Sequence, residues 1–166
     1  MKIYQLKTKQ KIPVSLDFAW DFFSNPNNLA KITPAKLNFT IKSDLPEKMR
    51  AGMIIEYTVS PLLNIPITWV TEITHVEEPF YFVDEQRIGP YKLWHHEHIF
   101  QRDDNGGTLM EDIVSYAIPF GFIGRIVHCL IIRKKIKEIF EFRTQTLKDL
   151  FPHSEKPEIF PEHVIT

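Results

Sequence analysis

Two histidines separated by a single residue, His96 and His98, carry the clearest chemical potential in this sequence. Together with Trp94 and Phe100 they alternate along one segment, and alternate side chains of a β-strand point to the same face of the sheet. Two imidazoles on one side of a strand can transfer protons, orient the polar end of a ligand or coordinate a metal ion. Their partners must come from neighbouring strands.

Asp112 is the candidate partner on the next strand. An Asp-Asp-Asn-Gly-Gly turn signal at 103–107 separates the two segments and predicts a hairpin. A three-residue loop places His98 opposite Asp112 and Trp94 opposite Tyr116, whereas a two-residue turn places Ile113 opposite His98. We prefer the first register because it brings the large aromatic side chains and the hydrogen-bonding partners to one face.

The strand before this hairpin adds Asp84 and Gln86, which reach the same face across a Gly-Pro turn at 89–90. The expected result is a mostly apolar cavity wall around a few polar side chains. The candidate ligand-binding residues are Asp84, Gln86, Trp94, His96, His98, Phe100, Met110, Asp112, Val114 and Tyr116.

Three interpretations of the polar side chains compete. In the first, the buried histidines are satisfied by carboxylates and fix the register of the sheet. In the second, they orient the polar end of a ligand in an apolar pocket. In the third, they act in catalysis or bind a metal ion. We expect no metal ion and no other cofactor, because imidazoles with carboxylate partners need no ion. No catalytic residue is assigned. A hydrolytic triad has no support, since no serine lies in a Gly-x-Ser-x-Gly elbow.

The elements that must position these residues follow from the periodicity. Alternation at 3–12 predicts a first strand, and Ser15 and Asn25 each predict the start of a short helix. A period of two predicts six further strands, and an apolar helical pattern predicts a long helix before an extended tail. The predicted ranges are 38–44, 53–60, 67–77, 80–88, 91–102 and 107–117 for the strands, 122–151 for the helix and 152–166 for the tail.

This order predicts an α+β fold. Consecutive strands with short links form an antiparallel meander, so we expect a curved, seven-stranded antiparallel sheet with two short helices after its first strand. The long C-terminal helix is the only element that can cover the apolar face, and we expect it across the concave side. A sheet that curls around one helix leaves a cavity between them. We expect residues 1–151 to form this single domain.

Five short segments resemble one known superfamily. They are Phe82-Val83-Asp84-Glu85-Gln86, Gly89-Pro90-Tyr91, Trp94-His95-His96-Glu97-His98-Ile99-Phe100, Met110-Glu111-Asp112-Ile113-Val114-Ser115-Tyr116 and Pro119-Phe120-Gly121. Through them the chain resembles the SRPBCC (START-like) superfamily, which includes plant pathogenesis-related allergens and bacterial polyketide cyclases, and within it a bacterial ligand-binding subgroup. The resemblance implies a helix-grip fold. The resemblance is less specific for function than for fold, because this scaffold hosts carriers, cyclases and chaperone co-factors.

The expected function is the binding of a small apolar ligand, lipid-like or aromatic and polyketide-like, between the sheet and the C-terminal helix. Two alternatives stay open. One is a cyclase- or dehydratase-type enzyme that uses a His–Asp pair as general acid and base. The other is a protein-interaction domain.

The long helix has two apolar faces that one groove cannot bury. The apolar side chains of 122–131 lie nearly opposite those of 132–150. Either the helix kinks near 133–135 and is covered within the chain, or its first part contacts something else. For the segment 120–131 the candidates are the apolar loop 61–66, a second copy in a homodimer, and a membrane surface.

The composition bounds the class of protein. The 166 residues include 20 lysines and arginines against 21 aspartates and glutamates, so we expect no nucleic-acid partner. A single cysteine, Cys129, excludes an internal disulfide. We expect a cytoplasmic protein, because no apolar run is long enough for a signal peptide or a membrane span. The remaining histidines, His75, His128, His153 and His163, are expected at the surface or its boundary.

Overall fold

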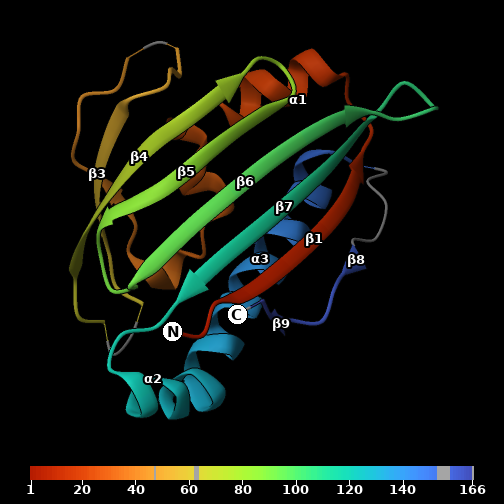
Figure 1. Ribbon diagram of the computed structural model, residues 1–166. Helices are drawn as coiled ribbons and strands as arrows, with labels where there is room; N and C mark the ends of the chain where they lie inside the picture. Colours follow the sequence, from red (N-terminus) through yellow and green to blue (C-terminus); the bar gives the residue numbers. More distant parts are fainter. Residues whose placement is uncertain (47, 62–63, 153–157, 166) are drawn as a thin grey trace.

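The structure is a computed structural model that describes residues 1–46, 48–61, 64–152 and 158–165. An antiparallel sheet carries helices on one face (Figure 1). Its strands are β1 Tyr4–Ile12, β2 Thr40–Ile41, β3 Met53–Val59, β4 Ile67–Glu77, β5 Tyr81–Ile88, β6 Leu93–Arg102, β7 Thr108–Ala117, β8 Glu158–Ile159 and β9 His163–Val164. The helices are α1 Leu16–Phe23, the 3-10 helices η1 Pro26–Ile32 and η2 Ala35–Leu37, α2 Gly121–Val127, the π-helical turn η3 His128–Ile132, and α3 Arg133–Leu150.

The sheet is an open meander in which the first strand lies beside β7. The strands lie in the order β2-β3-β4-β5-β6-β7-β1-β8, and β9 also pairs with β1. All of these pairs are antiparallel. The α+β class is therefore confirmed, together with a long C-terminal helix that follows the strands.

Among the described residues the sheet has nine strands, so the expected count of seven is wrong. We expected an extended tail, but its backbone bonds to β1, where the Phe160 N–H donates to the Lys7 carbonyl at 3.0 Å. Without the tail, β1 would leave a row of unpaired backbone groups at the edge of the sheet. The second strand is also shorter than expected, since β2 covers only Thr40–Ile41.

The two short helices begin where the sequence places their caps. The Ser15 hydroxyl accepts a hydrogen bond from the Phe18 N–H at the start of α1, and the Asn25 side chain accepts one from the Asn27 N–H at the start of η1. The buried face of α1 packs on β6, where the rings of Trp20 and Phe100 meet edge to face.

Helix α3 packs on the same face of the sheet as α1. Its buried side chains recur at helical spacing and are Ile136, Phe140, Arg143 and Leu147. Ile136 and Phe140 contact side chains of β1 and β7, while Leu147 joins Trp20 of α1 in one core cluster. Figure 1 shows α3 running behind the sheet along these strands.

The helical stretch expected at 122–151 is interrupted. The π-helical turn η3 separates α2 from α3, and α2 points away from the axis of α3 at one end of the molecule (Figure 1). The break lies just before the 133–135 segment, where a kink was one of the two alternatives that the sequence left open. A π-helical turn inserts extra backbone into one turn, which rotates the apolar face of α2 relative to that of α3. Among the described residues, no helix is both long and apolar enough to cross a membrane.

Candidate functional site

The β6–β7 hairpin has the register of a three-residue loop. His98 pairs with Asp112 and Trp94 pairs with Tyr116. The Asp103 N–H donates to the Gly107 carbonyl at 3.0 Å, which closes the loop. The preferred register is therefore confirmed, and β5 extends the site by pairing Asp84 with His96.

Five side chains form what we call the polar cluster: Asp84, His96, His98, Asp112 and Arg143. His96 Nε2 lies 3.0 Å from Asp112 Oδ1, and the Arg143 guanidinium donates to the same oxygen at 3.1 Å. His98 lies between the two carboxylates, because its Nε2 is 2.9 Å from Asp84 Oδ2 and its Nδ1 is 3.0 Å from Asp112 Oδ1. The Nδ1 contact is an ion-pair contact whose geometry does not meet that of a hydrogen bond.

The polar cluster is largely shielded from water, and its charged neighbours decide which of its groups are ionised. The exposed fraction is 1% for the Asp112 side chain, 5% for His98 and 7% for His96. Burial raises the pKa of a carboxyl, but Arg143 and the imidazoles outweigh burial and hold the pKa of Asp112 well below its usual range. In the same way His96 and His98 outweigh burial and lower the pKa of Asp84. Both carboxylates are therefore ionised at neutral pH.

The two imidazoles differ in their affinity for a proton. Burial and the neighbouring His98 lower the pKa of His96. At His98 burial acts in the same direction, but the hydrogen bond with Asp84 and the negative charges of Asp112 and Asp84 outweigh it and raise the pKa. The cluster therefore pairs a neutral imidazole with one that takes up a proton more readily.

Arg143 is the member of the cluster that sequence reasoning missed. It comes from α3, where it lies on the buried stripe between Phe140 and Leu147. Its guanidinium carbon also lies 5.6 Å from the centre of the Phe140 ring. An arginine is rarely buried without a partner, so its place on an apolar stripe was the available signal for a carboxylate across the interface.

Gln86 does not join the cluster, so that expectation is wrong. Its amide donates to the Tyr91 carbonyl at 2.7 Å and accepts from the Tyr91 N–H at 3.2 Å, which ties the β5–β6 turn together. The side chain folds under Gly89, where a Cβ would lie 2.3 Å from Gln86 Oε1. The absence of a side chain at Gly89 therefore leaves the space that Gln86 occupies at the turn.

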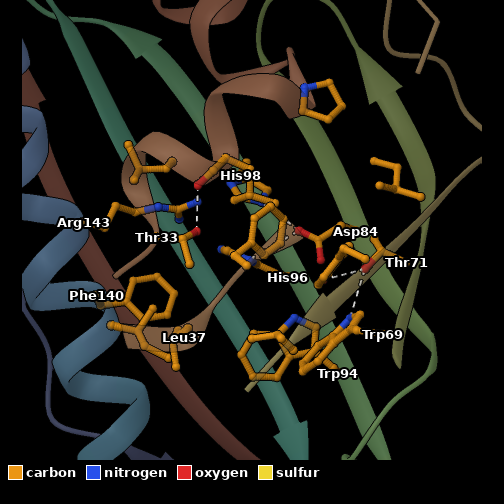
Figure 2. A pocket seen from close by; sticks show the side chains of 18 of the residues that line it. Thr33, Leu37, Trp69, Thr71, Asp84, Trp94, His96, His98, Phe140 and Arg143 are labelled. Atoms are coloured by element: carbon orange, nitrogen blue, oxygen red, sulfur yellow. Dashed lines mark hydrogen bonds and ion pairs between the residues drawn. The ribbon is translucent and has the colours of Figure 1, made fainter. Parts of the chain in front are cut away.

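A cavity of about 280 Å³ lies between the sheet, α1 with η1, and α3. In Figure 2 Asp84, His96, His98 and Arg143 converge on it from β5, β6 and α3. Much of the rest of the lining is aliphatic or aromatic, for example Phe23, Leu29, Ile32, Leu37, Ile55, Val59, Ile136 and Phe140.

Four of the ten predicted residues line the cavity: Asp84, Trp94, His96 and His98. The other six lie elsewhere. Phe100 and Met110 belong to the core beside α1, and Val114 and Tyr116 belong to the core beneath α3. Asp112 contacts the imidazoles without lining the cavity. Gln86 holds the β5–β6 turn. Sequence alternation identified the correct sheet face but not which part of that face the helices leave uncovered.

An aromatic wall lies beside the polar cluster in the lining of the cavity; we use this name for Tyr57, Trp69, Tyr91 and Trp94. The Trp94 and His96 rings have centroids 6.4 Å apart. The Trp69 and Trp94 rings meet edge to face at 5.5 Å. Tyr57 Oη and Trp69 Nε1 each lie 3.1 Å from Thr71 Oγ1, which fixes both rings. Figure 2 shows Trp69 beside Thr71. Burial raises the pKa of Tyr57 and of Tyr91, so both phenols are neutral. Sequence reasoning found only Trp94, although the alternation of β3 and β4 places Tyr57 opposite Trp69.

Two kinds of chemistry fit the cavity side of the polar cluster. A neutral His96 beside an ionised Asp112 has the arrangement of a general base. The potential ligand atoms of Asp84, His96 and His98 also lie within 4.8 Å of one another, as in a set of two histidines and one carboxylate that holds a divalent ion. These same atoms already contact one another, so an ion would have to displace the existing contacts.

A second buried cluster corrects the expectation for His128. The Tyr116 hydroxyl lies 2.9 Å from His128 Nε2 and donates to Glu162, and the Tyr4 ring stacks on the imidazole with centroids 3.7 Å apart. His128 is therefore buried rather than at the surface, because the tail folds back and brings Glu162 to it. His75 and His163 are exposed as expected, and His153 lies outside the described residues.

Solved structures with the same arrangement are similar to this chain in fold. Protein Ms6760 from Mycobacterium smegmatis has a TM-score of 0.63 and 17% identity, over 88% of this chain and 89% of that one. The major latex-like protein 151 from Panax ginseng has a TM-score of 0.65 and 12% identity, over 90% of this chain and 98% of that one. The nucleoside-diphosphate sugar epimerase from Corynebacterium glutamicum has a TM-score of 0.60 and 20% identity, over 86% of this chain but 28% of that one.

These likenesses show a shared helix-grip fold, in which a large antiparallel sheet packs on a long C-terminal helix. At such low identity they show the fold alone. No family model and no curated protein matches the chain.

Proposed function

We propose that this chain binds a small, largely apolar ligand in the cavity between the sheet and α3. The observation that supports the proposal is a cavity of about 280 Å³ with apolar walls and one group of polar side chains, the usual composition of a ligand pocket. Its volume is roughly twice that of a cavity that holds benzene. The proposed ligand therefore has about two rings, or a lipid-like chain of similar volume.

The aromatic and the polar parts of the lining suit the two ends of such a ligand. The aromatic wall would contact its rings or chain, because aromatic side chains offer large apolar surfaces in fixed orientations. Asp84, His96, His98 and Arg143 would orient a polar end, since each combines a buried position with polar atoms on the cavity side. We also place the chain in the bacterial ligand-binding SRPBCC subgroup and in the cytoplasm, in keeping with the five matching segments and the single cysteine.

A second candidate function rests on the histidines themselves. A cyclase or dehydratase needs a group that accepts a proton and a group that donates one. The depressed pKa of His96 and the raised pKa of His98 provide such a pair at the cavity surface. An enzyme would show a pH–rate profile with two limbs that His96→Gln and His98→Gln each remove, whereas a carrier would convert no ligand at any pH.

Ligand binding is tested with protein purified from its own host, by native mass spectrometry for a co-purified small molecule, and by titration with 2-naphthol. This probe has two rings and one hydroxyl group, and tryptophan emission reports it because Trp69 and Trp94 line the cavity. We expect saturable binding with one site per chain. Naphthalene, which lacks the hydroxyl group, should bind more weakly because the polar side chains then lose a partner.

A pair of neighbouring variants separates cavity binding from surface binding. Ile55 lines the cavity, whereas Ile54, the next residue of β3, is exposed. Ile55→Phe should weaken 2-naphthol binding by about tenfold or more because it fills the cavity, and Ile54→Phe should leave binding unchanged. Equal affinities in the two variants, with both folded by circular dichroism, would refute the proposed pocket.

A further inference from the structure

The end of the molecule formed by α2 exposes a row of large apolar side chains. We call it the apolar ridge: Phe120, Phe122, Ile123, Ile126 and Leu130, with exposed fractions of 81%, 67%, 68%, 46% and 71%. Single exposed apolar residues are ordinary, but a contiguous group marks a surface that meets a partner or a membrane. Figure 1 shows α2 at one end of the molecule, beside the N-terminus.

The ridge is held in this exposed position by specific local structure. Phe120 has a φ of 68°, an uncommon conformation for a residue with a side chain. Gly124 packs on the preceding turn so closely that a Cβ would lie 1.9 Å from the Pro119 carbonyl oxygen. Between Ile126 and Leu130 of the ridge, the buried His128 contacts Tyr4 and Tyr116 and so fastens η3 to the sheet. The exposure therefore belongs to an ordered helix.

Positive charge surrounds the ridge. No acidic residue occurs between Asp112 and Glu138, and the charged residues of that interval are Arg125, Arg133, Lys134, Lys135 and Lys137. A hollow beside α2 is lined by Phe120, Arg125, Lys2 and Lys92, so residues far apart in the sequence add to the same basic surface. Of these cations, Arg133 contacts Glu162, Lys135 contacts Glu138 and Lys137 contacts Glu141.

The charge selects the occupant of this surface. Two copies packed ridge to ridge about a two-fold axis would place the same basic residues opposite one another, and like charges across an interface are unfavourable. An anionic bilayer is complementary in both respects, because its headgroups attract lysine and arginine while its acyl region accepts large apolar side chains. We propose that the apolar ridge and the adjoining basic residues dock this protein on an anionic lipid bilayer.

In the docked arrangement α2 lies in the plane of the interface. The ridge enters the boundary between headgroups and acyl chains, and Arg125, Lys2 and Lys92 contact phosphate groups. Ile131 lines the cavity and is 40% exposed, so the docked surface borders the rim of the cavity. The proposal does not depend on what the cavity binds.

Vesicle binding tests the proposal with the full chain. Cys129 is the single cysteine, is exposed and lies next to Leu130, so a bimane dye attached to it reports the environment of the ridge. With vesicles of phosphatidylcholine and phosphatidylglycerol in equal parts we expect co-sedimentation and a blue shift of the dye emission. Vesicles of phosphatidylcholine alone, or high salt, should abolish most of the binding.

Two kinds of variant, each with a matched control, separate the contribution of the apolar ridge to vesicle binding from that of the basic residues. Ile126→Glu/Leu130→Glu should fold normally and lose vesicle binding, whereas Phe18→Glu/Ile54→Glu, at exposed positions outside α2, should bind as the unchanged chain does. Lys92→Gln should weaken binding by about fivefold, and Lys31→Gln, remote from the hollow, should not.

The proposal would be overturned if Lys92→Gln left the affinity for anionic vesicles unchanged, or if the chain bound both kinds of vesicle equally. So would a dimer in sedimentation equilibrium that Ile126→Glu/Leu130→Glu dissociates, because a second copy would then occupy the ridge. If that double variant fails to fold, Lys92→Gln/Arg125→Gln replaces it, with an expected loss of about 25-fold.

Discussion

Replacing Asp112 with alanine removes a side chain that contacts His96, His98 and Arg143 at once. Asp112 is 1% exposed, so water cannot take its place without opening the core. The variant would leave a buried guanidinium and two buried imidazoles without this carboxylate. The Thr8 hydroxyl, 3.5 Å from Asp112 Oδ2, would lose a weaker contact.

The expected cost follows from the geometry of the ion pairs. Removing one partner of a buried ion pair typically costs about 3–5 kcal/mol, chiefly because the other charge is left uncompensated. Asp84 still contacts both histidines, which places Asp112→Ala towards the lower end, at about 3 kcal/mol. Domains of this kind are stable by about 5–15 kcal/mol, so the variant should fold and unfold at a lower urea concentration.

Double-mutant cycles test whether the lost free energy belongs to these contacts. Urea unfolding at neutral pH would be measured for Asp112→Ala, His98→Leu, Arg143→Met and the two double variants that contain Asp112→Ala. Each second change removes the group that the first one strands, so we expect coupling energies of about 1–3 kcal/mol. Asp112→Ala/His98→Leu should recover part of the loss seen in Asp112→Ala alone.

Glu111 provides the matched control from the same strand. It faces the other side of the sheet and pairs with Lys9 at 3.1 Å near the surface. Glu111→Ala should cost less than about 1 kcal/mol and should add to His98→Leu within about 0.5 kcal/mol. Strictly additive losses for Asp112 with His98, and with His96 in a parallel cycle, would show that the groups do not interact. The ligand-orienting and catalytic proposals would then lose their main support.

Two further predictions concern the same cluster. The raised pKa of His98 means that its protonation contributes stability below about pH 6.5, and that this contribution is lost as the pH rises through the folded-state pKa. The unfolding free energy of the unchanged chain minus that of His98→Gln should therefore shrink as the pH rises from about 6.5 through the folded-state pKa. A difference that does not change with pH would contradict the assignment. We also expect no tightly bound metal, because the imidazole nitrogens that would coordinate it already contact Asp84 and Asp112; elemental analysis after dialysis tests this, and about one zinc per chain would refute it.

Much of the sheet was predictable because its rules are local. Alternation sets which face a side chain occupies, and the turn at 103–107 sets the register, so the contact of Asp112 with His96 and His98 followed from the sequence. The caps at Ser15 and Asn25 followed in the same way from side chains that bond their own backbone neighbours.

The rest depended on contacts between distant segments. Arg143 reaches Asp112 across 31 positions and Glu162 reaches Tyr116 across 46, and no periodicity within one element specifies such a meeting. The pairing of the tail with β1 was unpredictable for the same reason. It satisfies the backbone hydrogen-bonding groups of a sheet edge, and that edge exists only once the sheet has formed. The interruption by η3 was visible only as a conflict between two apolar faces, which the sequence left open between a kink and an external partner.

The structural and ligand-orienting interpretations of the polar cluster are compatible, because different atoms support them. Asp112 lies beneath the imidazoles, does not line the cavity, and joins β7 to α3 through Arg143. Asp84, His96, His98 and Arg143 line the cavity and are held by that carboxylate or by one another. A ligand's polar end would therefore meet side chains whose orientations are already set by folding. Such prior ordering would reduce the entropy that binding of the proposed ligand must overcome.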